Sequence, residues 1–365
     1  MTKCINCGES LEESWGYCPV CGTKVVVVAK TLCFNCGMVL KPQCEKCPKC
    51  NLRIINEGEQ QFWYSLYNNW RKIFAESLHG RNTSLSKSDI PDIYEISTIN
   101  CGKYDILNRY KIHNLEPLQG LKDLKKLNCS RNDITSLESL QGLTNLRELD
   151  CSRTNIRNLE PLKGLTNLKE LQCNETSIRN LEPLQGLTNL KKLDCSRTYI
   201  ESLESLKGLY NLEELQCNET NIRNLEPLHR LTILKKLDCS RTYIESLEPL
   251  KGLTNLEELQ CNEINIRNLE PLQGLTNLKK LDCSRTGITS LEPLHGLTNL
   301  RELVCNFTHI TSLKPLQRLR NLKVLWCKSF YISENEISNF KLSHQGSNEV
   351  NVFYDREWAK RVIKL

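Results

Sequence analysis

The apolar positions of this sequence repeat with a period of 22 residues. Each copy contains one cysteine, and ten of these follow one another at that interval: Cys129, Cys151, Cys173, Cys195, Cys217, Cys239, Cys261, Cys283, Cys305 and Cys327. In the copy spanning residues 190–211 the positions expected to point inward are Leu190, Leu193, Cys195, Ile200, Leu203, Leu206 and Leu209. Cys101 fits as a further copy at the front, 28 residues before Cys129. A fixed period of this length predicts a solenoid in which each copy stacks on its neighbour.

Each copy predicts one short strand, L-x-C, running parallel to the strand of the next copy. Parallel strands are spaced by about 4.8 Å, so eleven of them would span about 50 Å along the solenoid. The L-E-P-L segments predict short 3-10 or extended turns on the opposite side, because proline fixes φ and the repeat is too short for full helices.

The two ends of the repeat region carry helical patterns. Apolar residues fall at three-and-four spacing from about residue 59 to 79: Phe62, Trp63, Leu66, Trp70, Ile73, Phe74 and Leu78. This stripe predicts a helix that covers the first repeat, with a partner-binding helix as the alternative. Ser333 and Glu336 form a capping-box pattern at the start of a second helix. We expect the last repeat to be sealed by Trp326, Phe330, Tyr331, Phe353 and Trp358.

The repeat resembles the 22-residue leucine-rich repeats of the bacterial internalin type, L-x-x-L-x-L-x-x-N-x-I-x-x-L-x-x-L. Cysteine replaces the last strand leucine, and threonine replaces the turn asparagine in most copies: Thr154, Thr176, Thr198, Thr220, Thr242, Thr286 and Thr308. The resemblance implies that Asn132 hydrogen-bonds backbone in the turn after the strand, and a threonine hydroxyl performs a weaker version of this role. Ile264 has no polar group to do so, and we expect a local difference there.

Eight N-terminal cysteines form two sets with identical spacing, C-x2-C, ten residues, C-x2-C. The first set is Cys4, Cys7, Cys18 and Cys21, and the second is Cys33, Cys36, Cys47 and Cys50. Each C-x-x-C turn aims two thiolates at one tetrahedral ion, which predicts two zinc ions. The halves CINCG, CPVCG, CFNCG and CPKC resemble the double zinc ribbon family over residues 1 to about 55. Cys44 belongs to neither set, and we interpret it as a spare thiol.

The composition of the chain argues against several classes of function. The formal charge is +6, and two zinc sites with four thiolates each would lower it to about +2, which gives little support to nucleic-acid or membrane binding. The N-terminus has no apolar run of signal-peptide type, and the remaining cysteines behave as small buried hydrophobes in our interpretation, with a redox or metal role as the alternative. We therefore expect a cytoplasmic monomer. No grouping of residues suited to catalysis can be assembled, so we do not expect an enzyme.

The residues predicted to face outward from the strands alternate in charge from Glu170 onward, with KKLDCSRT followed by EELQCNET in a 44-residue period. Lysine and arginine would then pair with glutamate on the neighbouring strand. This face is either self-neutralised and solvated or a zwitterionic binding surface with an aromatic hot spot at its end, where contact with the C-terminal cap is the alternative. The candidate partner-binding residues are Lys192, Asp194, Arg197, Glu214, Gln216, Lys236, Asp238, Arg241, Val304, Phe307 and Trp326.

Together these patterns predict a repeat solenoid with a parallel leucine-rich-repeat sheet, helical caps and two small zinc ribbons. The expected divisions are a double zinc ribbon over residues 1–55, a linker and helical N-cap over 56–92, a solenoid of about eleven repeats over 93–332 and a C-terminal cap over 333–365. The expected function is a protein interaction scaffold or adaptor that binds a protein partner on the concave face. The alternative is a nucleic-acid-associated regulator that uses the ribbon residues Lys3, Lys24, Lys30, Lys41, Lys46, Lys49 and Arg53.

Overall fold

The computed structural model describes residues 2–3, 10–11, 66, 68–80, 84–86, 89–102, 111–329, 331–344 and 350–354. The chain divides into two compact units, Met1–Ser65 with Leu85–Pro91 and Leu66–Ser84 with Asp92–Leu365. In the first unit, strands β1 (Thr2–Lys3) and β2 (Ser10–Leu11) pair antiparallel. The eight predicted zinc ligands lie outside the described residues, so the zinc-ribbon prediction remains a prediction.

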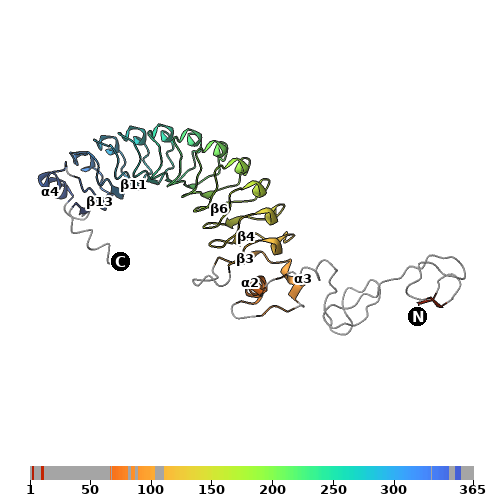
Figure 1. Ribbon diagram of the computed structural model, residues 1–365. Helices are drawn as coiled ribbons and strands as arrows, with labels where there is room; N and C mark the ends of the chain where they lie inside the picture. Colours follow the sequence, from red (N-terminus) through yellow and green to blue (C-terminus); the bar gives the residue numbers. More distant parts are fainter. Residues whose placement is uncertain are drawn as a thin grey trace. The chain divides into compact units, whose positions relative to one another are not determined.

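The second unit is built on a parallel sheet of twelve strands, each paired with its neighbours in sequence (Figure 1). Successive strands are in direct register, so Leu193 stands opposite Leu171 and Leu215. The strands are β3 (Thr98–Asn100), β4 (Lys126–Asn128), β5 (Glu148–Asp150), β6 (Glu170–Gln172), β7 (Lys192–Asp194), β8 (Glu214–Gln216), β9 (Lys236–Asp238), β10 (Glu258–Gln260), β11 (Lys280–Asp282), β12 (Glu302–Val304), β13 (Val324–Trp326) and β14 (Asn351–Phe353). The predicted parallel sheet is therefore confirmed.

Short 3-10 turns line the side of the repeats opposite the strands (Figure 1). Proline at the second position fixes φ in most of them, and a side chain two residues before the turn accepts its first N–H, as Asn158 does for Glu160 at 2.7 Å. The turns are η2 (Glu116–Leu118), η3 (Glu138–Leu140), η4 (Glu160–Leu162), η5 (Glu182–Leu184), η6 (Glu204–Leu206), η7 (Glu226–Leu228), η8 (Glu248–Leu250), η9 (Glu270–Leu272), η10 (Glu292–Leu294) and η11 (Lys314–Leu316). The 3-10 alternative of the prediction is the correct one.

The core is a stack of identical layers. In the copy spanning residues 190–211, all seven residues predicted to point inward, from Leu190 to Leu209, are at most 1% exposed. Full burial of a leucine stabilises by about 1.5–3 kcal/mol, and every repeat contributes several. Asparagine side chains join the layers at the surface, since the Asn189 amide donates to the Thr166 carbonyl at 2.9 Å and equivalent bonds recur along the solenoid.

The turn after each strand is held as the resemblance implied. The Asn132 amide donates to the carbonyls of Cys101, Cys129 and Ser130, and its oxygen accepts from the Ile112 N–H at 2.9 Å. Threonine makes one bond in the same place, and the Thr220 hydroxyl donates to the Cys217 carbonyl at 2.6 Å. The local difference expected at Ile264 lies in the side chain, which has no hydroxyl to donate to the Cys261 carbonyl, and not in the backbone. Glu263 has φ of 57°, within the narrow range of its equivalents, because the strand and ladder bonds on both sides fix this turn.

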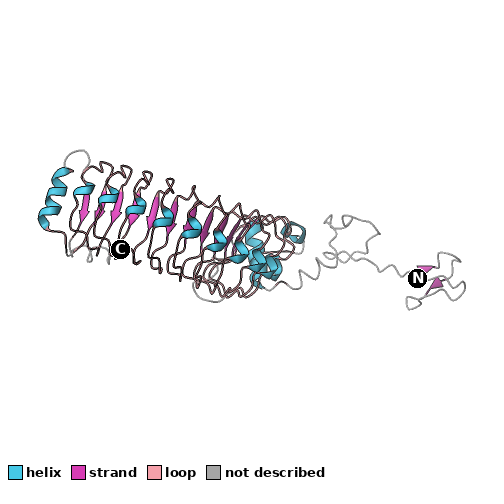
Figure 2. Cartoon of the chain, turned by 90° about the horizontal axis from the view of Figure 1, so that it is seen from above, coloured by secondary structure: helices cyan, strands magenta, loops and turns pink. Residues whose placement is uncertain are grey.

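A helix lies at each end of the second unit. Helix α2 (Asn68–His79) contacts β3 and buries Trp70, Ile73 and Phe74. Residues 59–65 of the predicted helix lie outside the described residues. The short helix α3 (Ile90–Ile93) precedes β3. Figure 2 shows the strands side by side, with α4 (Glu334–Ser343) beyond the last of them.

The C-terminal end departs from the sequence prediction in three ways. The Ser333 hydroxyl accepts from the Glu336 N–H as expected, but the Glu336 carboxylate accepts from Ser312 Oγ and Leu313 N of the solenoid, both at 2.7 Å. An unpredicted strand, β14, adds itself to β13. Tyr331 is 54% exposed, so it does not seal the last repeat. Phe330 and Trp358 lie outside the described residues.

Within the part of the chain that the structure describes, no helix is both long and apolar enough to cross a membrane.

Candidate partner-binding surface

The first and third residues of every strand point away from the core. On β7, β8 and β9 this places the predicted residues in two adjacent rows: Lys192, Glu214 and Lys236 in one, and Asp194, Gln216 and Asp238 in the other. The middle leucine of each strand is buried, as period-two alternation requires. The structure therefore brings these six candidates together on one face.

Arg197 and Arg241 belong to a third row, formed by a residue with positive φ in each of the nine repeats from Arg131 to Phe307. Among the described residues, these nine have φ between 52° and 59°, and eight of them are charged. Such a conformation costs an L-residue about 1 kcal/mol or more, and it is maintained here by the stacked repeats on both sides. The N–H of Arg197 donates to the Asn218 carbonyl of the next repeat at 2.9 Å, which continues the ladder beyond the strand. The sequence carried no glycine or asparagine that could have signalled this row.

The positive-φ row forms a continuous series of ion pairs. Glu219 accepts from Arg197 at 3.1 Å and from Arg241 at 3.3 Å. The series runs on both sides through Arg153, Glu175, Glu263 and Arg285, and the last pair, Glu263 with Arg285, is the longest at 4.0 Å. The predicted cross-strand pairing is confirmed. Because the arginines are about half exposed, each ion pair contributes less than about 1 kcal/mol to the stability of the fold.

A parallel set of lysine–glutamate pairs lies at the other border of the face. Glu213 accepts from Lys235 at 2.7 Å and from Lys191 at 2.9 Å. These two hydrogen bonds lower the pKa of the Glu213 carboxyl to about 2. Glu213 and Glu257 are the acidic members of this border, and the other eight positions at 22-residue intervals from Lys125 to Lys323 are lysine or arginine, so the border keeps a net positive charge.

This carboxyl gives a pH dependence of definite sign. The folded-state pKa of Glu213 is lower than its unfolded value, so its contribution to stability is complete above about pH 4.5 and is lost as the pH falls toward 2. We expect Glu213→Gln to reduce the free energy of unfolding by less than about 1 kcal/mol at pH 6, because its lysine partners are half exposed. Urea denaturation at pH 6 and pH 2.5 measures this difference, which should shrink in acid. Glu245→Gln, a change at an exposed glutamate, is the matched control.

The row that contains Asp194 and Asp238 is acidic. Asp194 and Asp238 each accept from the N–H and hydroxyl of the serine two residues later, with the hydroxyl distance at 2.6 Å. Burial, the largest effect, raises the pKa of both carboxyls above the usual value, and the neighbouring aspartates of the row add to it. Among the described residues neither aspartate forms an ion pair, so this row carries uncompensated negative charge.

Behind the face, eleven free cysteines from Cys101 to Cys327 form a buried row. Burial raises the pKa of Cys101 and of Cys327 to about 12, and raises that of Cys217 well above its usual value. The Cys217 thiol donates to the Asp238 carbonyl at 3.4 Å. These groups are therefore protonated at neutral pH, which favours the small-hydrophobe interpretation.

Alkylation tests the state of this row. At pH 8 about one thiol in ten thousand with a pKa near 12 is ionised, and the side chains have no access to solvent. We expect native protein treated with iodoacetamide at pH 8 to remain unmodified from Cys101 to Cys327, as read by peptide mass spectrometry. The same cysteines should be modified in urea. Rapid native alkylation of Cys217 would contradict the burial of the row.

The aromatic end of the face is partly covered and partly open. Val304, Trp326 and Phe353 stand side by side on β12, β13 and β14, and the Trp326 and Phe353 rings stack with centroids 3.9 Å apart. Phe307 and Phe353 each remain 37% exposed. The Arg285 guanidinium and the Lys328 ammonium lie 5.0 and 5.2 Å from the Phe307 ring centroid. The aromatic end of the face therefore contacts the C-terminal segment and also exposes an aromatic surface, so both predicted alternatives occur together.

Comparison with known proteins agrees with this geometry. The family model for leucine-rich repeats (two copies) matches residues 122–164, 144–186, 166–208, 254–294 and 276–317. The chain therefore contains leucine-rich repeats and folds as a leucine-rich-repeat solenoid. No curated protein sequence matches it significantly.

Similar solved structures support the same fold. An internalin, InlF, from Listeria monocytogenes is 21% identical with a TM-score of 0.66, over 79% of this chain and 89% of that protein. A leucine-rich-repeat protein of Leptospira interrogans is 23% identical with a TM-score of 0.62, over 67% of this chain and 64% of the other. A plant peptide hormone receptor, RGFR1, in complex with RGF2 is 18% identical with a TM-score of 0.55, over 72% of this chain and 48% of the receptor. This chain spans less than two thirds of the last two.

Proposed function

We propose that this protein is a cytoplasmic, monomeric interaction scaffold whose solenoid binds a protein partner on the outward face of the sheet. The observation that carries the proposal is the open aromatic group of Phe307 and Phe353 at the end of a polar face. Aromatic side chains are enriched among the residues that dominate protein interfaces. The leucine-rich-repeat fold is typically a non-enzymatic interaction scaffold, and the plant receptor of similar fold is in complex with RGF2.

The charges of the face favour a protein over a nucleic acid. A nucleic-acid surface needs one sign of charge over many repeats, whereas the positive-φ row alternates in sign from Arg153 to Arg285 and the row of Asp194 and Asp238 is acidic. The partner segment that fits this face carries cationic groups opposite Asp194 and Asp238 and apolar groups opposite the aromatic end. Nucleic-acid binding by the basic N-terminal residues remains the alternative. The protonated thiol row supports a reducing compartment such as the cytoplasm.

The test replaces Phe307 in the full chain. Phe307→Asp suits the positive φ of 57° at this position, because aspartate tolerates that conformation, and it puts a charge into the aromatic group. We expect the recovery of the co-purified partner, measured by quantitative mass spectrometry, to fall by about 30-fold, as loss of 2 kcal/mol at a hot spot implies. Tyr210→Asp alters an exposed tyrosine in the turn between η6 and β8 and should leave recovery unchanged. Equal recovery with Phe307→Asp would refute the proposed surface.

We further propose that residues 1–55 hold two structural zinc ions, one bound by Cys4, Cys7, Cys18 and Cys21 and the other by Cys33, Cys36, Cys47 and Cys50. All eight donors are thiols, which is the ligand set of structural zinc sites. The pairing of Thr2 with Leu11 and of Lys3 with Ser10 brings together the two ends of the segment that contains Cys4 and Cys7, as in a zinc knuckle on a hairpin. Bound zinc would supply folding energy to a segment with little core.

Metal analysis tests the zinc prediction. We expect purified full-length protein to contain about two equivalents of zinc, and Cys4→Ser with Cys7→Ser to lower this to about one. The Cys44→Ser variant should retain both ions, because Cys44 belongs to neither set. A metal content of one or zero in the unaltered chain would contradict the double-ribbon interpretation.

A further inference from the structure

A second series of interactions follows the flank of the solenoid, between the strands and the 3-10 turns. Tyr199 and Tyr243 stand 44 residues apart, and each is more than half exposed, at 53% and 59%. The Arg179 guanidinium lies 5.5 Å from the Tyr199 ring centroid, and Arg223 lies 5.4 Å from that of Tyr243. Each pair is a cation–π interaction between neighbouring repeats, repeated once per 44 residues.

The third member of this series lacks its ring. The next arginine at the same interval is Arg267, but the position of the tyrosine is taken by Gly287. A Cβ atom added to Gly287 would lie 3.4 Å from Arg267 Cγ and 3.1 Å from the Ile266 carbonyl oxygen. The arginine stem therefore packs against the glycine, and among the described residues no aromatic ring lies under the Arg267 guanidinium.

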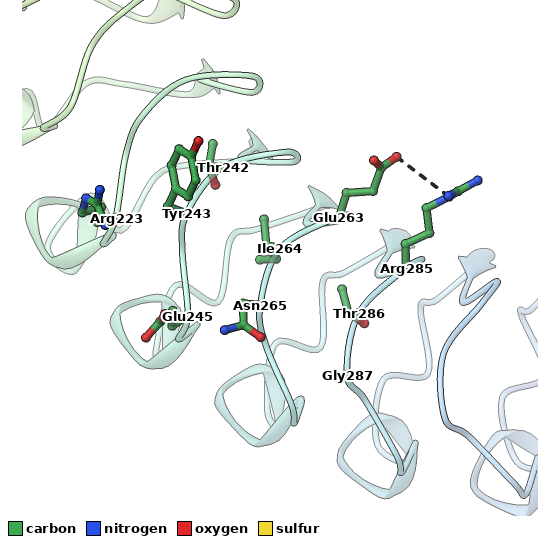
Figure 3. A pocket seen from close by; sticks show the side chains of 10 residues that line it. All are labelled: Arg223, Thr242, Tyr243, Glu245, Glu263, Ile264, Asn265, Arg285, Thr286 and Gly287. Carbon is green, nitrogen blue, oxygen red and sulfur yellow. Dashed lines mark ion pairs between the residues drawn. The ribbon is translucent and has the colours of Figure 1, made fainter.

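A depression of about 650 Å³ occupies this part of the flank, and Figure 3 shows Tyr243 on one side of it and Gly287 on the other. Its lining contains Ile264, which is 4% exposed and stands where eight other repeats have threonine or asparagine. Glu245 and Asn265 add polar groups to the lining. The two departures from the repeat, Ile264 and Gly287, thus line the same depression. Gly287 lacks the bulky side chain found at Tyr199 and Tyr243, and Ile264 adds an apolar surface.

We infer that this depression binds a tyrosine side chain presented by a protein partner, with its ring over Gly287 and against Arg267. The ring would take the place that Tyr199 and Tyr243 occupy in their own repeats, and Arg267 would complete the third cation–π pair. Ile264 offers the apolar contact, and Glu245 or Asn265 offers an acceptor for the phenol hydroxyl. The depression borders the positive-φ row, since Glu263 and Arg285 also line it, but the residues proposed to hold the ring belong to none of the three rows, so the inference goes beyond the function proposed above.

Peptide display on the full-length protein tests the inference. Random peptides are selected on the unaltered chain, and the enriched peptides are then measured against Gly287→Tyr, which fills the depression from within. We expect the enriched peptides to share a tyrosine and to lose at least about tenfold in affinity, equal to about 1.4 kcal/mol, on this variant. Arg267→Ala should weaken the same peptides. Phe307→Asp should bind them unchanged, so this test succeeds or fails independently of the sheet-face proposal.

Two controls separate filling of the depression from disturbance of the fold. Ser177→Tyr adds the same side chain at the equivalent position beside Arg157, five repeats earlier, and should leave peptide binding intact. Gly287→Ala adds the Cβ without the ring and should also retain binding. The inference is overturned if no peptides are enriched, if the enriched peptides bind Gly287→Tyr as well as the unaltered chain, or if Gly287→Ala abolishes binding to the same extent.

Discussion

Replacement of Cys217 by aspartate is expected to lower the free energy of unfolding by more than about 4 kcal/mol, enough to disrupt the middle of the solenoid. Cys217 is fully buried, and strands β7 and β9 place Cys195 and Cys239 in the layers on either side. An aspartate there would be a carboxylate without a cation, or a neutral acid without a full set of hydrogen bonds. Urea denaturation of the full chain followed by circular dichroism measures the effect.

The matched control is Cys217→Ala. It keeps the site apolar and removes one atom, so we expect a loss of about 1 kcal/mol. The contrast between the two variants tests the role of the thiol, because a small hydrophobe tolerates alanine and a chemically active thiol does not. Loss of the fold with alanine as complete as with aspartate would mean that the sulfur does more than fill space.

Replacement of Asn132 by alanine is expected to cost about 2–4 kcal/mol. The side chain makes four hydrogen bonds, all to backbone groups of a buried turn, and alanine would leave the Ile112 N–H and the Cys101 carbonyl without these bonds. Each orphaned buried group costs about 1–3 kcal/mol, and relaxation recovers part of the sum. The change in the urea midpoint at constant m-value gives the free-energy difference.

Asn132→Thr provides the comparison. Threonine at the equivalent positions makes one bond to the carbonyl of the preceding cysteine, as Thr154 does with Cys151 at 2.7 Å. We expect this variant to lose about half of what alanine loses, because it satisfies one carbonyl and leaves the Ile112 N–H without the side-chain acceptor. If threonine and alanine were equally destabilising, the hydroxyl bonds seen in seven repeats would contribute nothing to the turn.

The periodic part of the fold could be predicted from the sequence because every copy has the same pattern of apolar and polar positions. Leucine, isoleucine and cysteine recur at fixed positions, and each layer buries them in the same way. The pairing of Arg197 with Glu175 and Glu219 could also be predicted, since registers of parallel strands place residue n beside residues n−22 and n+22. Cys101, 28 residues before Cys129, was placed correctly because β3 obeys the same register as its neighbours.

The remaining features depend on tertiary context. Arginine, glutamate and phenylalanine do not signal a positive φ, and only the stacked repeats impose it on Arg197 and Phe307. The Glu336 carboxylate binds Ser312 and Leu313 rather than its own helix terminus, because the solenoid offers it two donors. Strand β14 has no repeat pattern and forms by adding to the edge of β13. The missing ring at Gly287 follows from the contacts of Tyr199 and Tyr243 with their arginines, which form only when neighbouring repeats stack.

Site-specific photocrosslinking in cells tests most directly whether the sheet face binds a protein partner. A benzophenone amino acid replaces Gln216, which is exposed on the sheet face in β8, or Gln185, which is exposed at the end of the turn η5 on the opposite side. We expect crosslinked protein partners from position 216 that are absent from position 185 and are reduced by Phe307→Asp. Crosslinks from position 185 alone, or from neither position, would contradict it.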